Sequence, residues 1–203
     1  AYLIEGNDVG GIDVGFLVKT APVVGATPRV TVNSVTQYGL TTTYVNPNTG
    51  ASELLNDRPP LLLDAVVNHA NGATFPVTVI VNHLRSMNGV DDPTPSGTGT
   101  EGARVRAKRN AQAEYLANLI QGRQTATPAE RIIAIGDFNA FDVNDGYVHM
   151  MGTIGGTPVP DNETVVVGDG ADLVSPDLVN LVNTPPAAER YGMMPRLDRF
   201  VVD

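Results

Sequence analysis

The chain has 203 residues, with 42% hydrophobic and 17% charged residues, a formal net charge of −9 at pH 7 and no cysteine. This length suits one domain or two small ones, and no apolar run approaches the roughly 18 to 20 residues that span a bilayer, which excludes a transmembrane segment. Without cysteine, the chain cannot form a disulfide framework, a Cys-ligated zinc site, an iron–sulfur cluster or a thiol nucleophile.

The N-terminal part of the chain predicts two short strands separated by loops. A glycine-punctuated stretch, residues 6–19, contains a strand-like segment at 14–18, and its glycines indicate unusual backbone conformations or close approach to another part of the chain. Residues 30–35 alternate in character and predict a second strand, which a polar, turn-rich surface loop at 44–50 follows.

The clearest secondary-structure signal is a β-hairpin. Two apolar, mostly β-branched segments, residues 61–67 and 75–82, are separated by a short polar stretch that contains Asn71 and Gly72. An Asn-Gly pair suits a tight turn, so the two segments should pair as antiparallel strands.

A long helix is predicted after a flexible loop. Residues 91–102 carry two prolines, three glycines and no apolar side chain, which indicates a mobile loop within one domain. Apolar residues at helical spacing then predict a helix from 103 to 121, with Gly122 placed to end it. The basic residues of this helix are Arg104, Arg106, Lys108 and Arg109. Such a cluster is usually the solvated face of a helix, and the alternative is a contact with a polyanion.

The last third of the chain predicts less regular structure. Residues 131–135 indicate a short buried strand, residues 144–151 indicate one or two helical turns, and mostly loops follow. The chain closes on a strand-like segment at 197–203. Because proteins rarely end in a core strand, and because the first methionine is Met87, we expect the chain to be a piece of a longer protein.

Polar side chains follow two of the predicted strands at the points where the strands end. His83 comes after the second strand of the hairpin, and Asp137 and Asn139 follow the strand at 131–135. Asp198 begins the last predicted strand, so its carboxylate would reach the same sheet edge if that strand ran antiparallel to the other two. One imidazole among several oxygen donors suits a hard divalent cation and a phosphate ester better than zinc.

Each of these residues also has a simpler structural interpretation. His83 by itself could be a hydrogen-bonded structural histidine, and Asp137 with Asn139 could form an Asx-turn that caps the next segment. Arg58 and Arg85 could each clamp a phosphate with the guanidinium fork, and the alternative for each is an ordinary surface arginine.

Several motifs, in this order and at this spacing, resemble the endonuclease/exonuclease/phosphatase superfamily, and the similarity covers essentially the whole chain. The motifs are Asn82-His83-Leu84-Arg85-Ser86, Arg109 with Gln112, Gly136-Asp137-Phe138-Asn139-Ala140-Phe141, Asn144-Asp145-Gly146-Tyr147 and Leu197-Asp198-Arg199. Two further stretches resemble a bacterial, often secreted, branch of extracellular nuclease-like proteins. They are Gly10-Gly11-Ile12-Asp13-Val14-Gly15 and Arg58-Pro59-Pro60-Leu61.

The resemblance implies an α/β (α+β) fold in which two mixed β-sheets, flanked by helices, pack as a DNase I-like four-layer sandwich. Residues 1–203 would form a single domain that is truncated at both ends. The family's N-terminal strands, with an early asparagine and a metal-binding glutamate, would precede Ala1, and its closing strand with the Ser-Asp-His segment would follow Asp203. Without those strands, open sheet edges could pair with another copy of the chain.

The resemblance also implies metal-dependent hydrolysis of phosphate esters by the complete protein, with Mg²⁺ or Mn²⁺, or alternatively Ca²⁺, as the cofactor. We expect a secreted, extracellular or periplasmic nuclease that acts on DNA or RNA, of which this chain would be an incomplete form and could be inactive. An acidic chain lacks the broad basic face that holds nucleic acid by counterion release. A lipid or phosphoinositide phosphoesterase, which the acidic balance favours, and a non-catalytic binding or structural module therefore stay open.

Each candidate residue takes its role from the matching family motif. His83 would contact the scissile phosphate or assist the leaving oxygen, Asp137 would orient or deprotonate the attacking water, and Asn139 would hold a phosphate oxygen. Asp198 would orient a second histidine that lies nearer the C-terminus in the family. Asp137 and Asn139 are also the candidate metal ligands, although the family's main ligands lie outside this chain. The expected phosphate- or substrate-binding residues are Arg58, Arg85 and Asn144.

Overall fold

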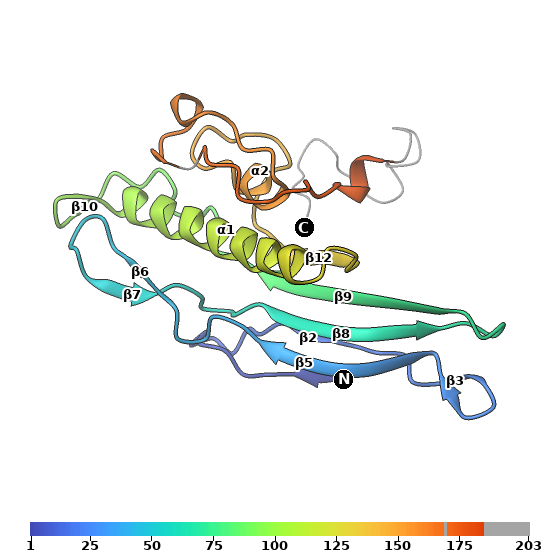
Figure 1. The fold of residues 1–203 in the computed structure, drawn as a ribbon. Coiled ribbons are helices and arrows are strands. Elements are labelled where there is room, and N and C mark those ends of the chain that lie inside the picture. The colour runs from blue at the N-terminus through green and yellow to red at the C-terminus, as the bar shows by residue number, and fades with distance from the viewer. Residues whose placement is uncertain (169, 185–203) are drawn as a thin grey trace.

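The computed structural model describes residues 1–168 and 170–184 of the chain. Within these residues, the regular structure comprises one four-stranded sheet, four two-stranded ribbons, one long and one short α-helix and two 3₁₀ turns (Figure 1). The strands are β1 Tyr2–Leu3, β2 Gly15–Phe16, β3 Pro22–Val24, β4 Thr27–Pro28, β5 Val30–Gln37, β6 Thr43–Val45, β7 Ser52–Leu54, β8 Leu61–Asn68, β9 Thr74–His83, β10 Pro95–Ser96, β11 Gly99–Thr100 and β12 Ile132–Asp137. The helices are α1 Glu101–Ala126 and α2 Met150–Gly155, and the 3₁₀ turns are Asp161–Glu163 and Leu181–Asn183.

The predicted hairpin forms the centre of the main sheet. β8 and β9 pair as antiparallel strands from Leu61 opposite Val81 to Asn68 opposite Thr74. At the turn, Gly72 adopts a φ of 83°, which glycine tolerates without steric cost, and the Asn71 side chain accepts a hydrogen bond from the N–H of Ala73 at 3.0 Å. The hairpin prediction is therefore confirmed, together with the turn chemistry on which it rests.

β5 and β12 complete the main sheet on opposite sides of the hairpin, in the order β12-β9-β8-β5. β5 pairs antiparallel with β8, whereas β12 pairs parallel with β9. A parallel pair needs a long crossover, and α1 supplies it because the helix lies between β9 and β12 in the sequence and packs along the sheet (Figure 1). The carboxyl ends of β9 and β12 therefore lie at the same edge of the sheet.

α1 is longer than the sequence predicts at both of its ends. The Thr100 side chain accepts a hydrogen bond from the first turn at 3.2 Å, so the helix begins at Glu101, inside the predicted mobile loop. Gly122 lies within the helix instead of ending it, because one interior glycine costs only about 1 kcal/mol. Residues 95–100 of the predicted loop form the ribbon of β10 and β11, and Thr98 there donates its N–H to Asn48 O at 2.8 Å.

Apolar side chains cover both faces of the main sheet, because successive strand residues point to opposite sides. The larger cluster lies between the sheet and the helices, and its buried members include Leu62, Ile80, Leu116, Ala117 and Ile120. The smaller cluster, on the other face, contains Leu61, Leu63 and Ala65 of β8 with Val14 and Phe16 of the N-terminal segment. The short strand β2 thus pairs with β1 and also packs Phe16 against the sheet face.

β12 is only half-buried, contrary to the prediction of a buried strand. Ile132 and Ala134 pack against the larger cluster, whereas Ile133 and Ile135 are 37% and 44% exposed. β12 is an edge strand, so among the described residues only β9 flanks it in the sheet. This free, apolar edge is the kind of feature that favours self-association, which stays a prediction.

The stretch predicted as a surface loop at 44–50 is partly buried. Tyr44 lies in β6, and the side chains of Asn46 and Asn48 are almost completely buried. Asn46 Oδ1 accepts the N–H of Asn48 at 2.9 Å, and Asn48 Nδ2 donates to Thr100 O at 2.7 Å. A polar composition predicts a solvated loop. Composition alone cannot distinguish such a loop from a buried one whose polar groups form hydrogen bonds within the protein.

The described residues form a mixed structure of helices and sheets, which confirms the α+β class. The helical turns predicted at 144–151 occur later, as α2. No helix in residues 1–168 or 170–184 is long and apolar enough to cross a bilayer. The strand predicted at 197–203 lies outside the described residues.

Glu130 ties α1 to the main sheet. It lies in the connection between α1 and β12, where it forms an ion pair with Arg123 of α1 and accepts the hydroxyl hydrogen of Thr78 of β9. A second contact, from Arg123 Nε to Glu130 Oε2, measures 3.0 Å. Burial acts to raise the pKa of Glu130, but these hydrogen bonds outweigh it and hold the pKa below its ordinary value.

We expect Glu130→Gln to lower the free energy of unfolding by about 1–2 kcal/mol at neutral pH, because the charged acceptor is lost. Since the pKa is lowered in the folded state, the carboxylate contributes fully above its ordinary value of 4.5, and its contribution is lost as the pH falls through the folded-state pKa. Urea unfolding at about pH 7 and about pH 3.5 should therefore show that the difference in the free energy of unfolding between the wild type and Glu130→Gln is smaller at the lower pH. The control is Glu163→Gln at an exposed position, and an equal effect of both variants would contradict the prediction.

Candidate functional site

The parallel pairing of β12 with β9 brings two predicted catalytic residues together. The register pairs Asp137 with His83, and Asp137 Oδ2 lies 3.5 Å from His83 Nε2. Gly136 permits this approach, because its φ is 122° and a Cβ at this position would lie 2.0 Å from Asn82 O. Any other residue at position 136 would push the two strand ends apart.

Asn139 links the loops that follow β12 and β9. Its φ of 49° is left-handed, and its N–H donates to Asp137 Oδ1 at 2.9 Å. Its Nδ2 donates to Leu84 O at 2.9 Å. The first bond is the Asx-turn of the structural interpretation, and the second holds Asn139 beside the loop that follows His83. Within the described part of the chain, Asn139 Oδ1 accepts no hydrogen bond.

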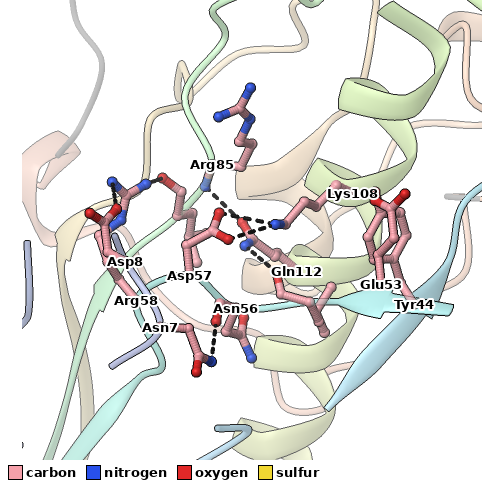
Figure 2. A network of polar contacts seen from close by, with 12 residues as sticks. Asn7, Asp8, Tyr44, Glu53, Asn56, Asp57, Arg58, Arg85, Lys108 and Gln112 are labelled. Atoms are coloured by element: carbon pink, nitrogen blue, oxygen red, sulfur yellow. Dashed lines mark hydrogen bonds and ion pairs between the residues drawn. The ribbon is translucent and has the colours of Figure 1, made fainter. Parts of the chain in front are cut away.

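Arg58 holds the end of β9 from the loop between β7 and β8. Its Nε donates to His83 O at 3.3 Å and its Nη2 donates to Leu84 O at 3.2 Å. Its Nη1 lies 3.5 Å from Asp8 Oδ2, and Figure 2 shows this ion pair at one end of a longer polar network. To clamp a phosphate, Arg58 would have to exchange one of these contacts, so that role stays a prediction.

The surroundings of His83 favour its neutral form. Burial lowers the pKa of His83, and the positive charge of Arg58 acts in the same direction. The carboxylates of Asp137 and Asp8 act in the opposite direction, but the pKa stays below its ordinary value. The lowered pKa favours the neutral imidazole, which has one ring N–H to donate and one ring nitrogen to accept.

Asp8 is a site residue that the sequence prediction missed. Its Oδ1 accepts the N–H of Gly10 at 2.7 Å, which closes a turn, while its other carboxylate oxygen faces Arg58. The neighbouring Asn7 anchors this turn by donating from Nδ2 to Asn56 O at 2.9 Å (Figure 2). An Asn-Asp pair before glycine predicts a turn. No local pattern indicates, however, which distant segment the turn will contact.

The predicted basic cluster of α1 faces inward at two of its four positions. Lys108 is 8% exposed and Arg109 is completely buried. Lys108 Nζ lies 2.9 Å from Asp57 Oδ1 (Figure 2). Neither interpretation drawn from the sequence, a solvated face or a contact with a polyanion, describes these two residues. The physical reason is that polar loops lie against this part of the helix, where Asp57 pairs with Lys108 and backbone carbonyls accept from Nη1 of Arg109.

Gln112 of α1 joins two of the loops around the site. Its Oε1 accepts the N–H of Arg85 at 2.7 Å, and its Nε2 donates to Leu55 O at 2.8 Å. Figure 2 shows the side chain of Arg85 turned away from this network, and among the described residues its guanidinium makes no hydrogen bond or ion pair. Arg85 therefore presents a positive charge that an anion could meet.

Asn144, a further predicted site residue, makes its side-chain contacts away from this cluster. Asn144 uses its side chain locally, because its Oδ1 accepts the N–H of Gly146 and its Nδ2 donates to Glu163 O, both at 2.9 Å. Its role in binding substrate stays a prediction. Asp198 lies outside the described residues, so its predicted place at the same sheet edge also stays a prediction.

Comparisons of the chain with protein-family models, with curated proteins and with solved structures find no match. The superfamily that the sequence motifs resemble therefore stays a prediction. Any function must be inferred from the side chains at the carboxyl ends of β9 and β12.

The left-handed backbone at Asn139 predicts a difference in stability between two substitutions at this position. We expect Asn139→Gly to be more stable than Asn139→Ala by about 1 kcal/mol, because both lose the amide and only alanine must place a Cβ at positive φ. Chemical denaturation of the two variants measures the difference. The same pair of substitutions at Asn144, whose φ is not positive, should favour alanine. Equal stability of the two Asn139 variants would be inconsistent with the left-handed conformation.

Proposed function

We propose that this protein is a metal-dependent phosphodiester hydrolase that acts on nucleic acid, and that the described residues are part of a DNase I-like sandwich. The observation that carries the proposal is the contact between His83 and Asp137, which two parallel strands bring to 3.5 Å. Asn139 and Arg85 lie on the loops that follow the same strands. An imidazole, a carboxylate, an amide and a free cation at one edge suit a phosphate ester.

Each of these residues has a distinct part in the proposed reaction. Asp137 orients the attacking water and accepts its proton through Oδ2. The neutral His83 donates a hydrogen bond from its ring N–H to a phosphate oxygen or to the leaving oxygen as the P–O bond breaks, and the leaving oxygen takes its proton from bulk water. Asn139 Nδ2 has a second N–H, besides the one bound to Leu84 O, that can hold a phosphate oxygen. Arg85 offsets the negative charge of the phosphate.

The oxygen donors at this edge fit a hard divalent cation. The oxygens that could face a cation are Asp137 Oδ2, which also contacts His83 Nε2 at 3.5 Å, and Asn139 Oδ1. Mg²⁺ is commonly held by one or two carboxylates together with water and substrate phosphate. Residues 1–168 and 170–184 contain no group of three or more His, Cys, Asp or Glu side chains that could hold a metal. When bound, Mg²⁺ or Mn²⁺ would stabilise the negative charge that develops on the phosphate.

We expect the chain to nick supercoiled plasmid DNA in the presence of Mg²⁺ or Mn²⁺, and we expect EDTA to abolish the activity. Asp137→Asn and His83→Ala should each lower the rate by about 100-fold or more, because each removes a group that acts on the reacting atoms. Gel electrophoresis of the nicked plasmid measures the rate.

The matched control for this experiment is Glu163→Gln, which removes an exposed carboxylate of the same chain. All variants should first be shown to fold, by circular dichroism. Near-normal nicking by Asp137→Asn or His83→Ala would refute the assigned roles. Absence of metal-dependent cleavage of every phosphodiester tested would refute the proposed function for this chain.

A second candidate function is hydrolysis of a lipid or phosphoinositide headgroup by the same residues. The observation that favours it is the burial of Lys108 and Arg109, which removes two cations from the surface of an already acidic chain. A small headgroup needs few cationic contacts, whereas a long polyanion is usually held by many.

The two substrates can be distinguished by direct comparison. If nucleic acid is the substrate, cleavage of plasmid should exceed headgroup release from sphingomyelin or phosphoinositide vesicles. The logarithm of the plasmid-binding constant, plotted against the logarithm of the salt concentration, should then have a slope of only about −1 to −2, because few phosphates contact a basic side chain. Headgroup release without any plasmid cleavage would replace the nuclease with the lipid phosphoesterase.

A further inference from the structure

Arg109 is a buried charge on the face of α1 that packs against the rest of the protein. Its side chain is 0% exposed. The residues one turn before and after it, Val105 and Ala113, are buried and apolar. Arg109 is therefore a charged residue between two apolar ones, and its buried neighbours Lys108 and Gln112 are polar as well.

The hydrogen bonds of Arg109 reach both loops of the candidate site. Its Nη1 donates to Arg85 O at 2.6 Å and to Asn139 O at 2.8 Å. The first carbonyl lies on the loop after β9, and the second lies on the loop after β12. Gln112, one turn further along α1, accepts the N–H of the same Arg85. The helix thus holds both peptide groups of Arg85 and one of Asn139.

Burial of Arg109 at this position has a desolvation cost that its contacts offset only in part. Its Nε and Nη2 have no hydrogen-bond partner within the described residues, and the nearest carboxylate oxygen, Asp145 Oδ2, lies 3.8 Å from Nη2. Burial lowers the pKa of Arg109, and Asp145 acts in the opposite direction. An apolar side chain would pack here without this desolvation cost. The requirements of the core therefore do not explain the arginine, whereas its contacts with the two loops do.

The conformation of Asn139 depends on being held from several sides. A non-glycine residue with a left-handed φ persists only where its surroundings over-determine it. Asp137 Oδ1 binds the N–H of Asn139, Leu84 O binds its side chain, and Arg109 binds its carbonyl. Of these three contacts, only the one from Arg109 comes from outside the two strand-end loops.

We infer that Arg109, assisted by Gln112, is a positioning residue that sets Arg85 and Asn139 in the geometry that binds a phosphate ester. The identity of the ligand as a phosphate ester rests on the proposed function, whereas the positioning of the two loops by Arg109 does not. Arg109 itself does not touch substrate, because it is completely buried behind the loops.

The experiment compares Arg109→Lys with Arg106→Lys. Arg106 is the matched control, because it lies on the same helix and donates to a loop carbonyl, Val90 O, at 2.6 Å, away from the site. In Arg109→Lys, amide hydrogen exchange at Leu84, Arg85 and Asn139 should rise by about tenfold or more, while exchange in the centres of β8 and β9 stays unchanged. Arg106→Lys should change none of these amides.

If the wild-type protein hydrolyses phosphodiesters, steady-state kinetics provide a second measurement. Arg109→Lys should lower kcat by about 10- to 100-fold and change KM by less than about threefold, because misplaced groups mainly affect the transition state. If the wild-type protein hydrolyses nothing, the proposed function fails, and the exchange comparison still decides whether Arg109 positions the loops.

Two results would overturn the inference. One is exchange at the three loop amides that matches the wild type, and the other is a rise that is equally large in β8 and β9, which would indicate a general loss of stability. If Arg109→Lys does not fold, Asp145→Asn takes its place, since it weakens the nearest charge partner of Arg109. That variant should raise exchange at the same loop amides, and unchanged exchange there would also overturn the inference.

Discussion

The parallel pairing of β12 with β9 is the constraint on which the rest of the candidate site depends. Two parallel strands end at the same edge of a sheet, so the residues that follow them meet even though more than fifty positions separate them in the chain. Glycine at position 136 lets the two strand ends approach closely, because a Cβ there would collide with the backbone of β9. His83 and Asp137 come within 3.5 Å as a result.

α1 has two functions in this arrangement. As the crossover, it covers one face of the sheet with apolar side chains such as Leu116 and Ile120. At its polar positions it binds the loops around the site, through Lys108, Arg109 and Gln112. One helix therefore stabilises the core and orients the loops, so a change in how it packs would reach the candidate site directly.

Most of the cationic side chains near the site pair with other groups of the protein. Arg58 and Lys108 pair with Asp8 and Asp57, and Arg109 binds backbone carbonyls. Arg85 is different, because its guanidinium makes no hydrogen bond or ion pair within the described part of the chain. In a chain with a net charge of −9, a substrate phosphate would therefore meet a small, local cationic group rather than a broad basic surface.

The sequence by itself determined the features that depend on neighbouring residues. Apolar, mostly β-branched runs and an Asn-Gly turn are local, so the β8–β9 hairpin could be predicted, and so could the polar residues at the ends of β9 and β12. Only the tertiary structure decided that Asp8 reaches Arg58, that Asn46 and Asn48 are buried, and that Arg109 faces inward. These outcomes depend on which distant segments supply partners for a polar group, and composition and periodicity along one segment carry no information about those partners.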